Sequence, residues 1–197
     1  AMVQDVDGNI FLDFVAGIGV LNIGHSHPEV VEAVKAQAER YFAPNLNVFN
    51  YAEYTKLAEK LNEIIPIEGE KETILVNTGA EADENAIKIA RRFTGRSEII
   101  CFEGAFHGRS YMTMAMTSKC KPYKTGFGPL PQGVNRFPFP YCYRCPHKLE
   151  RETCGLHCLK RFEESYFLEY VAPDQVAAII LEPVLGEGGF IVPPQEY

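Results

Sequence analysis

The sequence predicts an α/β fold built on a mainly parallel sheet. The β-prone apolar run 73–77 and the apolar run 98–102 flank a helical stretch over 81–93, which is the pattern of a strand–helix–strand unit. A third apolar run, 177–181, follows a helical segment over about 159–170. Its continuous apolar character suits a parallel strand that is buried on both faces.

The residues before this unit predict a hairpin and two amphipathic helices. Residues 3–14 alternate polar and apolar side chains around a Gly-Asn turn, which predicts two short antiparallel strands. Apolar residues recur every three to four positions after Pro28, which suits the first position of a helix. The next helix is predicted over 51–65, where Asn50 and Glu53 can form a capping box.

Composition narrows the class of ligand. The chain has 197 residues, 46% of them hydrophobic and 23% charged, which is enough for a folded core. Its formal net charge of −7 disfavours nucleic acid and anionic membrane surfaces as partners, so we expect a small-molecule ligand. The sequence shows neither an apolar run of membrane-spanning length nor a signal-peptide pattern at its start, which predicts a cytoplasmic protein.

In open α/β sheets ligands bind beyond the carboxyl ends of the strands, and three stretches there carry polar chemistry. The first is the turn of Thr78, Gly79 and Ala80 before the predicted helix. The amides of Gly79 and Ala80, together with the helix dipole, could hold a phosphate, while Thr78 and Glu81 could cap the same turn reciprocally. The alternative is an ordinary capped helix start.

The second stretch, residues 103–110, combines an aromatic ring, an imidazole and a guanidinium between glycines. Phe106 could stack on a heteroaromatic ring, His107 could adjust the ring's surroundings, and Arg109 could bind a carboxylate through two hydrogen bonds. A solvent-exposed histidine and a surface arginine are the alternative for His107 and Arg109.

The third stretch places Glu182 and Glu187 just after the last predicted strand. Two carboxylates in such a place are costly to leave unpaired, so each needs a donor or a positive partner. Structural ion pairs are the alternative to a ligand-binding role.

These motifs, with others in the same order, identify a resemblance that covers nearly the whole chain outside a cysteine-rich excursion. The chain resembles the class III (subgroup II) pyridoxal-phosphate-dependent aminotransferases and is most similar to 4-aminobutyrate aminotransferase. The matching stretches are Asp7-Gly8 through Leu12-Asp13-Phe14, Ala16-Gly17-Ile18-Gly19-Val20, Gly24-His25-Ser26-His27-Pro28, Asn77 to Ala82 with Glu84-Asn85-Ala86, Phe106-His107-Gly108-Arg109, and Glu182-Pro183 with Gly186-Glu187-Gly188-Gly189.

The resemblance implies a fold-type-I architecture. Residues 1–27 would form an N-terminal segment with the hairpin, and residues 28–197 the first part of the large cofactor-binding domain. It also implies a homodimer that transfers an amino group from an amino acid, such as 4-aminobutyrate or an ornithine-type donor, to a 2-oxo acid such as 2-oxoglutarate.

The resemblance also implies the contacts of the cofactor. Gly79 and Ala80, next to Thr78, would bind its phosphate. Phe106 would stack on the pyridine ring with His107 beside it, and Glu182 would lie near the 3-hydroxyl.

Three further residues carry over to the substrate. Arg109 would receive a substrate carboxylate. Glu187 matches an acidic switch that pairs with an arginine late in family sequences, and Ile18 matches a pocket position. Because ornithine aminotransferases have tyrosine at that position, Ile18 disfavours ornithine as the main donor.

The reaction also needs a Schiff-base lysine and an acid against the pyridine nitrogen. None of Lys88, Lys119 and Lys124 lies in a matching context, so both groups are expected beyond Tyr197. Two alternatives stay open: an amino-acid racemase of the same fold, and a truncated, non-catalytic binding module.

The remaining motif is a cysteine-rich excursion over 138–158. Its four cysteines form C-x2-C and C-x3-C pairs, which could bind zinc, form disulfides or stay free thiols. We expect this excursion and the Pro- and Gly-rich stretch 122–146 to lie on the surface between sheet elements. The four cysteines are Cys142, Cys145, Cys154 and Cys158.

Overall fold

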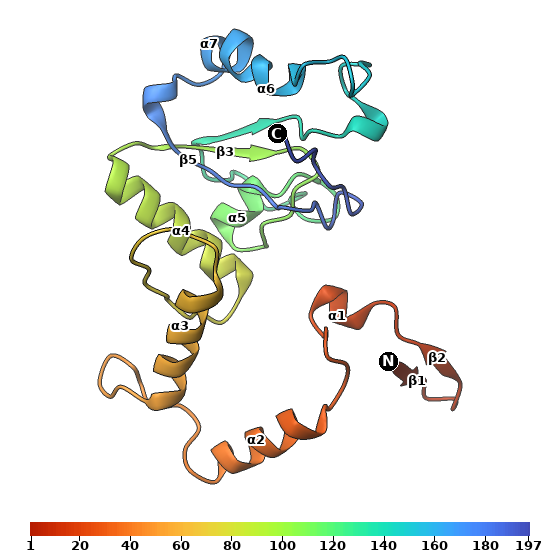
Figure 1. Cartoon of the computed structure of the whole chain (residues 1–197), viewed down its shortest axis with the longest axis vertical. Helices are drawn as coiled ribbons and strands as arrows, with labels where there is room; N and C mark the ends of the chain where they lie inside the picture. The colour runs from red at the N-terminus through yellow and green to blue at the C-terminus, as the bar shows by residue number, and fades with distance from the viewer. The chain divides into compact units, whose positions relative to one another are not determined.

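The computed structural model describes all 197 residues, which form two compact units (Figure 1). The first unit is Ala1–Thr73 and the second is Ile74–Tyr197. The predicted segment 1–27 lies inside the first unit, and its assignment to a domain of its own stays a prediction. None of the helices is both long and apolar enough to cross a membrane.

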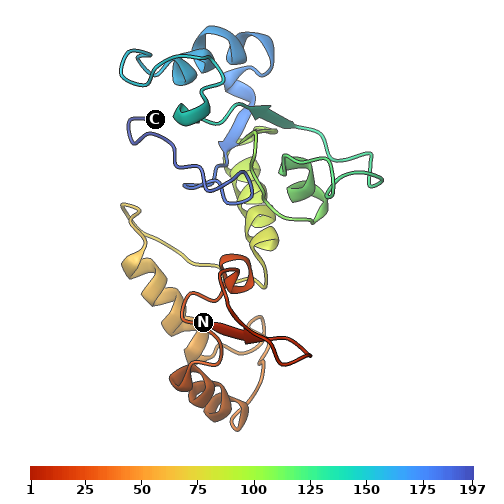
Figure 2. The same ribbon diagram turned by 90° about the vertical axis from the view of Figure 1, so that its right-hand side faces the viewer.

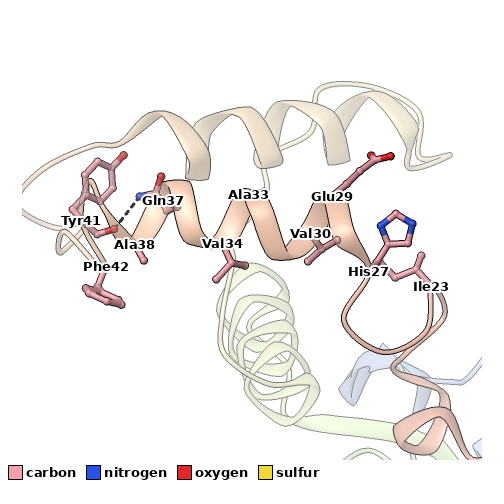
Figure 3. Close-up of a pocket in the computed structure, with 10 residues that line it drawn as sticks. All are labelled: Ile23, His27, Glu29, Val30, Ala33, Val34, Gln37, Ala38, Tyr41 and Phe42. Atoms are coloured by element: carbon pink, nitrogen blue, oxygen red, sulfur yellow. Dashed lines mark hydrogen bonds between the residues drawn. The ribbon is translucent and has the colours of Figure 1, made fainter. Parts of the chain in front are cut away.

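The first unit contains the predicted hairpin and both predicted helices. The hairpin strands pair antiparallel with Met2 opposite Leu12 and Gln4 opposite Ile10, which confirms the hairpin. The elements are β1 (Met2–Gln4), β2 (Ile10–Leu12), α1 (Ala16–Gly19), α2 (Pro28–Ala38) and α3 (Ala52–Ile64). The apolar face of α2 lines an open groove with Ile23, Tyr41 and Phe42 (Figure 3).

The predicted capping box at the start of α3 is wrong. Tyr51 is the N-cap and no side chain caps the helix. The Asn50 side chain accepts hydrogen bonds from the Tyr51 amide at 2.8 Å and from the Thr55 hydroxyl at 3.1 Å. Glu53 is drawn instead to the Arg40 guanidinium, 3.0 Å away, and to the Tyr41 hydroxyl, because charged and phenolic donors compete with the backbone for its carboxylate.

The second unit is built on a three-stranded parallel sheet in the order β4-β3-β5. The central strand β3 (Glu98–Phe102) pairs Ile99 with Val134 on one side and Ile100 with Ile179 on the other. Its neighbours are β4 (Val134–Phe137) and β5 (Val176–Ile179). The predicted strands 98–102 and 177–181 are thus confirmed, the second displaced by one to two residues.

Alternation along β3 divides the core into two layers. Ile99 and Cys101 pack against Ile87 of α4 (Gly79–Thr94) and against α5 (Tyr111–Met116). Ile100 and Phe102 face the other way, toward an aromatic cluster that includes Phe137, Phe162 and Tyr166. Figures 1 and 2 show the strands between α4 on one side and the helical segment 157–169 on the other.

Three expectations for the second unit are corrected. Residues 73–77 are not a strand, and the sheet consists of β4, β3 and β5 alone. The stretch 122–146 is not only a surface excursion: it supplies β4, and Phe137 and Phe139 are buried in the core. The helix expected over 159–170 is divided into three short turns, which are α6 (His157–Arg161), the π-helical turn η2 (Phe162–Tyr166) and α7 (Phe167–Glu169).

Candidate active site

Three loops of the second unit converge at the carboxyl edge of the sheet, as expected for parallel strands. Gly108, with φ +127°, packs against the first turn of α4, where a Cβ would come within 2.7 Å of the Ala80 Cβ. Gly188 approaches the loop after β3, where its Cβ would lie 3.0 Å from the Gly104 carbonyl oxygen. The structure therefore brings together all three stretches predicted from the strand ends.

The start of α4 has the form of an anion-binding turn. The Thr78 hydroxyl accepts a hydrogen bond from the Glu81 amide at 3.0 Å. The amides of Gly79 and Ala80 occupy the first turn, where no helical carbonyl can accept from them, and a Cβ on Gly79 would meet nothing within 4 Å. Donors with a helix dipole behind them and open space ahead suit a phosphate.

The reciprocal cap predicted between Thr78 and Glu81 is only half formed. The Glu81 carboxylate accepts from the Asn77 amide at 2.7 Å and the Asn77 side chain at 3.1 Å, one residue before the expected amide. The Glu81 carboxylate therefore fixes Asn77, just before the helix, and leaves the amides of the first turn open.

His107 is buried beside this turn. Only 6% of the residue is exposed, its Nδ1 lies 3.2 Å from the Asp83 carboxylate, and its amide donates to the Thr117 hydroxyl at 3.1 Å. Its Nε2 is buried with no hydrogen-bond partner. A buried imidazole nitrogen without a partner is costly, which favours a ligand at this edge of the sheet.

Phe106 is held by its backbone and by its ring. The Phe106 amide donates to Glu182 at 2.8 Å, and the other Glu182 oxygen accepts from the Gly186 amide at 2.9 Å. Glu182 therefore connects two of the converging loops, and each of its oxygens has a backbone partner. The ring of Phe106 meets the Tyr123 ring edge to face, with centroids 5.1 Å apart.

Arg109 and Glu187 differ in their partners. Arg109 is exposed and forms no hydrogen bond or ion pair in the structure. Glu187 accepts from the Lys119 ammonium at 2.7 Å and from the Tyr123 hydroxyl at 3.0 Å. Lys119 and then Tyr123 hold the pKa of Glu187 below its usual range, so this carboxylate is ionised at neutral pH.

Two charged residues that the sequence reasoning missed fix the short helix behind the loop. Glu84 accepts from the Ser110 hydroxyl at 2.6 Å and the Met112 amide at 3.1 Å, at the start of α5. Arg136, on β4, donates to the carbonyls of the last α5 residues and of Thr117, at 2.7 to 3.2 Å. Opposite charges thus complement the dipole of α5 at both ends. No local sequence signal marked Arg136, because the strand β4 that carries it was not predicted.

Two predictions remain, for Ile18 and for the four clustered cysteines. Ile18 belongs to the first unit, where it is exposed in the turn α1 with a φ of +61°. Its pocket role stays a prediction.

The zinc prediction for Cys142, Cys145, Cys154 and Cys158 is not supported. All six cysteines are free, and nowhere in residues 1–197 do three or more potential ligands form a group that could hold a metal. The four cysteines do line one small cavity together with His147 and His157. Burial raises the pKa of Cys158 and lowers that of His147, which disfavours the thiolate in one case and the imidazolium in the other.

Comparison with protein families gives a match over the whole chain. The family model described as "Aminotransferase class-III" matches residues 1–197.

Curated relatives match the chain over about half of their own length. It is 50% identical over 197 residues to a probable 4-aminobutyrate aminotransferase of Bacillus subtilis, covering all of this chain and 45% of that protein. It is 43% identical to the 5-aminovalerate aminotransferase DavT of Pseudomonas putida, covering 98% of this chain and 44% of that protein.

A solved structure matches at the level of the fold. An (S)-enantioselective omega-transaminase from Thermomicrobium roseum superposes with a TM-score of 0.89 at 34% identity, covering all of this chain and 44% of that one. The similarity confirms that the fold is the first part of a fold-type-I transferase.

Proposed function

Because the chain belongs to the class-III aminotransferase family, we propose that it forms part of a pyridoxal-phosphate-dependent aminotransferase. The observation that carries this proposal is the convergence of the open α4 turn, the Phe106 ring and the unpaired Arg109 at one edge of the sheet. An anion site, a stacking ring and a free guanidinium are what a phosphorylated aromatic cofactor and a carboxylate substrate require.

The amino donor we propose is an ω-amino acid. Relatives of this chain are named for 4-aminobutyrate and 5-aminovalerate, which both carry a terminal amine and one carboxylate. The acceptor would be a 2-oxo acid such as 2-oxoglutarate. The racemase alternative has no support among these relatives, and the non-catalytic module remains an outcome of the test below.

The geometry of the second unit supports a set of cofactor contacts. The amides of Gly79 and Ala80, capped by Thr78, would hold the phosphate. The Phe106 ring would stack on the pyridine, and the unpaired Nε2 of His107 would face the same ligand. When bound, pyridoxal phosphate supplies the electron sink for the transfer of the amino group.

Arg109 and Glu182 would have different roles, one toward the substrate and one toward Phe106. Arg109 would orient the substrate through its carboxylate, because its guanidinium is free and planar. Glu182 would act mainly by holding Phe106 in place rather than through the 3-hydroxyl, since each of its oxygens already accepts from a backbone amide. The resemblance also assigns Ile18 to the substrate pocket, and we keep that role as part of the proposal.

We further propose that the Schiff-base lysine and the aspartate for the pyridine nitrogen are supplied outside residues 1–197. No lysine of this chain has the family context, and the chain covers only about 45% of its relatives. A homodimer and a cytoplasmic location are expected on the same grounds of resemblance.

The test uses the full-length protein that contains this chain. Incubated with pyridoxal phosphate, 4-aminobutyrate and 2-oxoglutarate, it should produce glutamate, whereas a racemase would interconvert amino-acid enantiomers without any 2-oxo acid. A protein that binds pyridoxal phosphate but does neither would be a binding module.

A variant sharpens the assignment of Arg109. Arg109→Ala should raise the KM for the amino donor by a factor of about 10 to 100, because a charged hydrogen bond is lost, and should leave the affinity for pyridoxal phosphate nearly unchanged. Arg92→Ala, at an exposed position on α4, is the matched control. Equal loss of both affinities would contradict the role of Arg109.

A further inference from the structure

We propose that Asp83 is a positioning residue of this site, which holds the His107 ring so that Nε2 is the nitrogen left free for the cofactor. This inference rests on the proposed function, because it assigns a residue to the cofactor end of that same site. Asp83 was not among the residues predicted from the sequence.

The first step of the argument is the place of Asp83 on α4. It follows Ala80 by three residues and Gly79 by four, so it lies one helical turn beyond the open anion-binding turn and on the same face of the helix. Its carboxylate contacts the ring of His107, 24 residues further along the chain, with Oδ2 3.2 Å from Nδ1. Asp83 therefore connects the helix that would bind the phosphate with the loop that follows β3.

The second step is that Asp83 is the only hydrogen-bond partner of the His107 ring. Thr117 fixes the backbone on both sides of this ring, because its hydroxyl accepts from the His107 amide at 3.1 Å and donates to the Gly108 carbonyl oxygen at 2.9 Å. The His107 side chain is only 4% exposed, and its Nε2 has no partner. A carboxylate only accepts hydrogen bonds, so Nδ1 carries the proton of the contact with Asp83, and Nε2 is the nitrogen that remains available.

The third step is the place of His107 within the site. The residue before it, Phe106, is held by Glu182, and the residue after it, Gly108, packs against Ala80 in the first turn of α4. His107 therefore lies at the junction of the proposed phosphate turn and the proposed stacking ring. A buried Nε2 without a partner is costly, and a hydrogen bond to a bound ligand removes this cost only while the ring keeps its orientation.

The fourth step is what the pair loses when either member is changed. Without Asp83 the buried ring has no partner on either nitrogen, so it is free to rotate and to carry its proton on Nε2. Without His107 the carboxylate stays in contact with water, because the side chain of Asp83 is 30% exposed. We therefore expect a substitution of Asp83 to affect the cofactor only while His107 is present.

The experiment is a double-mutant cycle in the full-length protein that measures affinity rather than activity. The probe is pyridoxine 5′-phosphate, which has the ring and the phosphate of the cofactor without its aldehyde, and equilibrium dialysis gives its dissociation constant. Asp83→Leu should raise this constant roughly 3- to 30-fold, whereas the same substitution in a His107→Phe background should change it by less than about twofold. Asp83→Asn, which keeps an acceptor oxygen, should cause a smaller rise, and Asp174→Leu, at an exposed aspartate of the same unit, is the control.

A purely structural role for Asp83 gives a different pattern. If its carboxylate only stabilises the start of α4 through the helix dipole, Asp83→Leu will raise the dissociation constant equally with and without the His107 ring. That result overturns the inference, and so does an Asp83→Leu variant that binds the probe as tightly as the wild type. Circular dichroism checks that each variant is folded, and if Asp83→Leu is not, the cycle is run with Asp83→Asn.

A second readout separates this inference from the proposed function, because it needs no ligand. Nitrogen-15 NMR of histidine-labelled protein shows which nitrogen of the His107 ring bears a proton, and the spectrum of His107→Phe identifies the signal. Nδ1 should be protonated in the wild type, and Asp83→Leu should favour a proton on Nε2 instead. An unprotonated Nδ1 in a wild type that binds the probe overturns the inference alone, whereas a wild type that binds no probe refutes the proposed function and with it the role of Nε2 toward the cofactor.

Discussion

The two units of the chain differ in where their apolar side chains lie. In Ile74–Tyr197, β3 is closed on both faces, and Ile99, Ile100 and Cys101 are 0% exposed. In Ala1–Thr73 no residue is buried, and Phe14 and Phe42 are 91% and 88% exposed. The second unit has a core of its own, whereas the first is held by local hydrogen bonds and presents apolar surface of the kind that other protein surfaces cover.

The largest expected effect on stability is the difference between truncating a buried apolar side chain of the second unit and an exposed one of the first. Phe102→Ala should lower the free energy of unfolding by about 3–5 kcal/mol, because it leaves a cavity between Phe139 and Phe162. Val34→Ala, on the open face of α2, should change it by less than about 0.5 kcal/mol within this chain. Urea denaturation of both variants measures the difference.

If Val34→Ala lowered the free energy of unfolding as much as Phe102→Ala, the two units would not differ in the way described. In the full-length protein that result would show that the groove of α2 is covered by other residues of the protein or by a second subunit.

An intermediate effect is expected for arginines in the two units. Arg136→Met should cost about 1–3 kcal/mol, because three carbonyls at the end of α5 lose their donor. Arg40→Met, which breaks an ion pair on the surface of the first unit, should cost less than about 1 kcal/mol. Thermal denaturation of the two variants tests the order, and a larger loss for Arg40→Met would contradict it.

The smallest expected effect is a response of the Glu187 contact to pH. The pKa of Glu187 is lowered in the folded protein, so the contact stabilises the fold above the pKa of the unfolded chain and is lost as the pH falls through the folded pKa. Carbon-13 NMR of the Glu187 carboxyl should show a midpoint below the usual range. Lys119→Met should move this midpoint upward, and Lys121→Met should leave it in place.

The elements predicted best from the sequence are those that a single local segment encodes. Residues 98–102 form the expected strand, and Gly79 and Ala80 begin the expected helix, because apolar runs and small-residue turns encode these elements locally. Residues 73–77 have the composition of a strand and do not form one, since a strand also needs a pairing partner, which its own sequence does not encode. The strand Val134–Phe137 was missed because its four residues lie in a stretch dominated by Pro and Gly.

In the candidate site, too, some features could be predicted from local sequence and others could not. Two of the three loops follow β3 and β5, whose carboxyl ends share one edge of the parallel sheet, as the sequence predicted. The third, at the start of α4, joins them through the close approach of Gly108 to Ala80. The roles of Glu84, Arg136 and Lys119 depend on contacts across 20 to 68 residues, which no local pattern encodes. Glu182 was predicted as a functional residue, but its two backbone partners became visible only once the loops were placed.

The contact of Arg136 with α5 also bears on how β4 finds its place beside β3. Adjacent residues of a strand face opposite sides, so a slip of one position would turn Arg136 toward Phe162 and Tyr166 and would aim Phe137 at the open carbonyls of α5. Both exchanges are unfavourable, because a guanidinium would be buried among rings and polar oxygens would face an apolar side chain. The charge that caps α5 thus also disfavours a shifted register between β4 and β3. Because β3 leads into the loop of Phe106, the correct register also helps to fix the position of that loop.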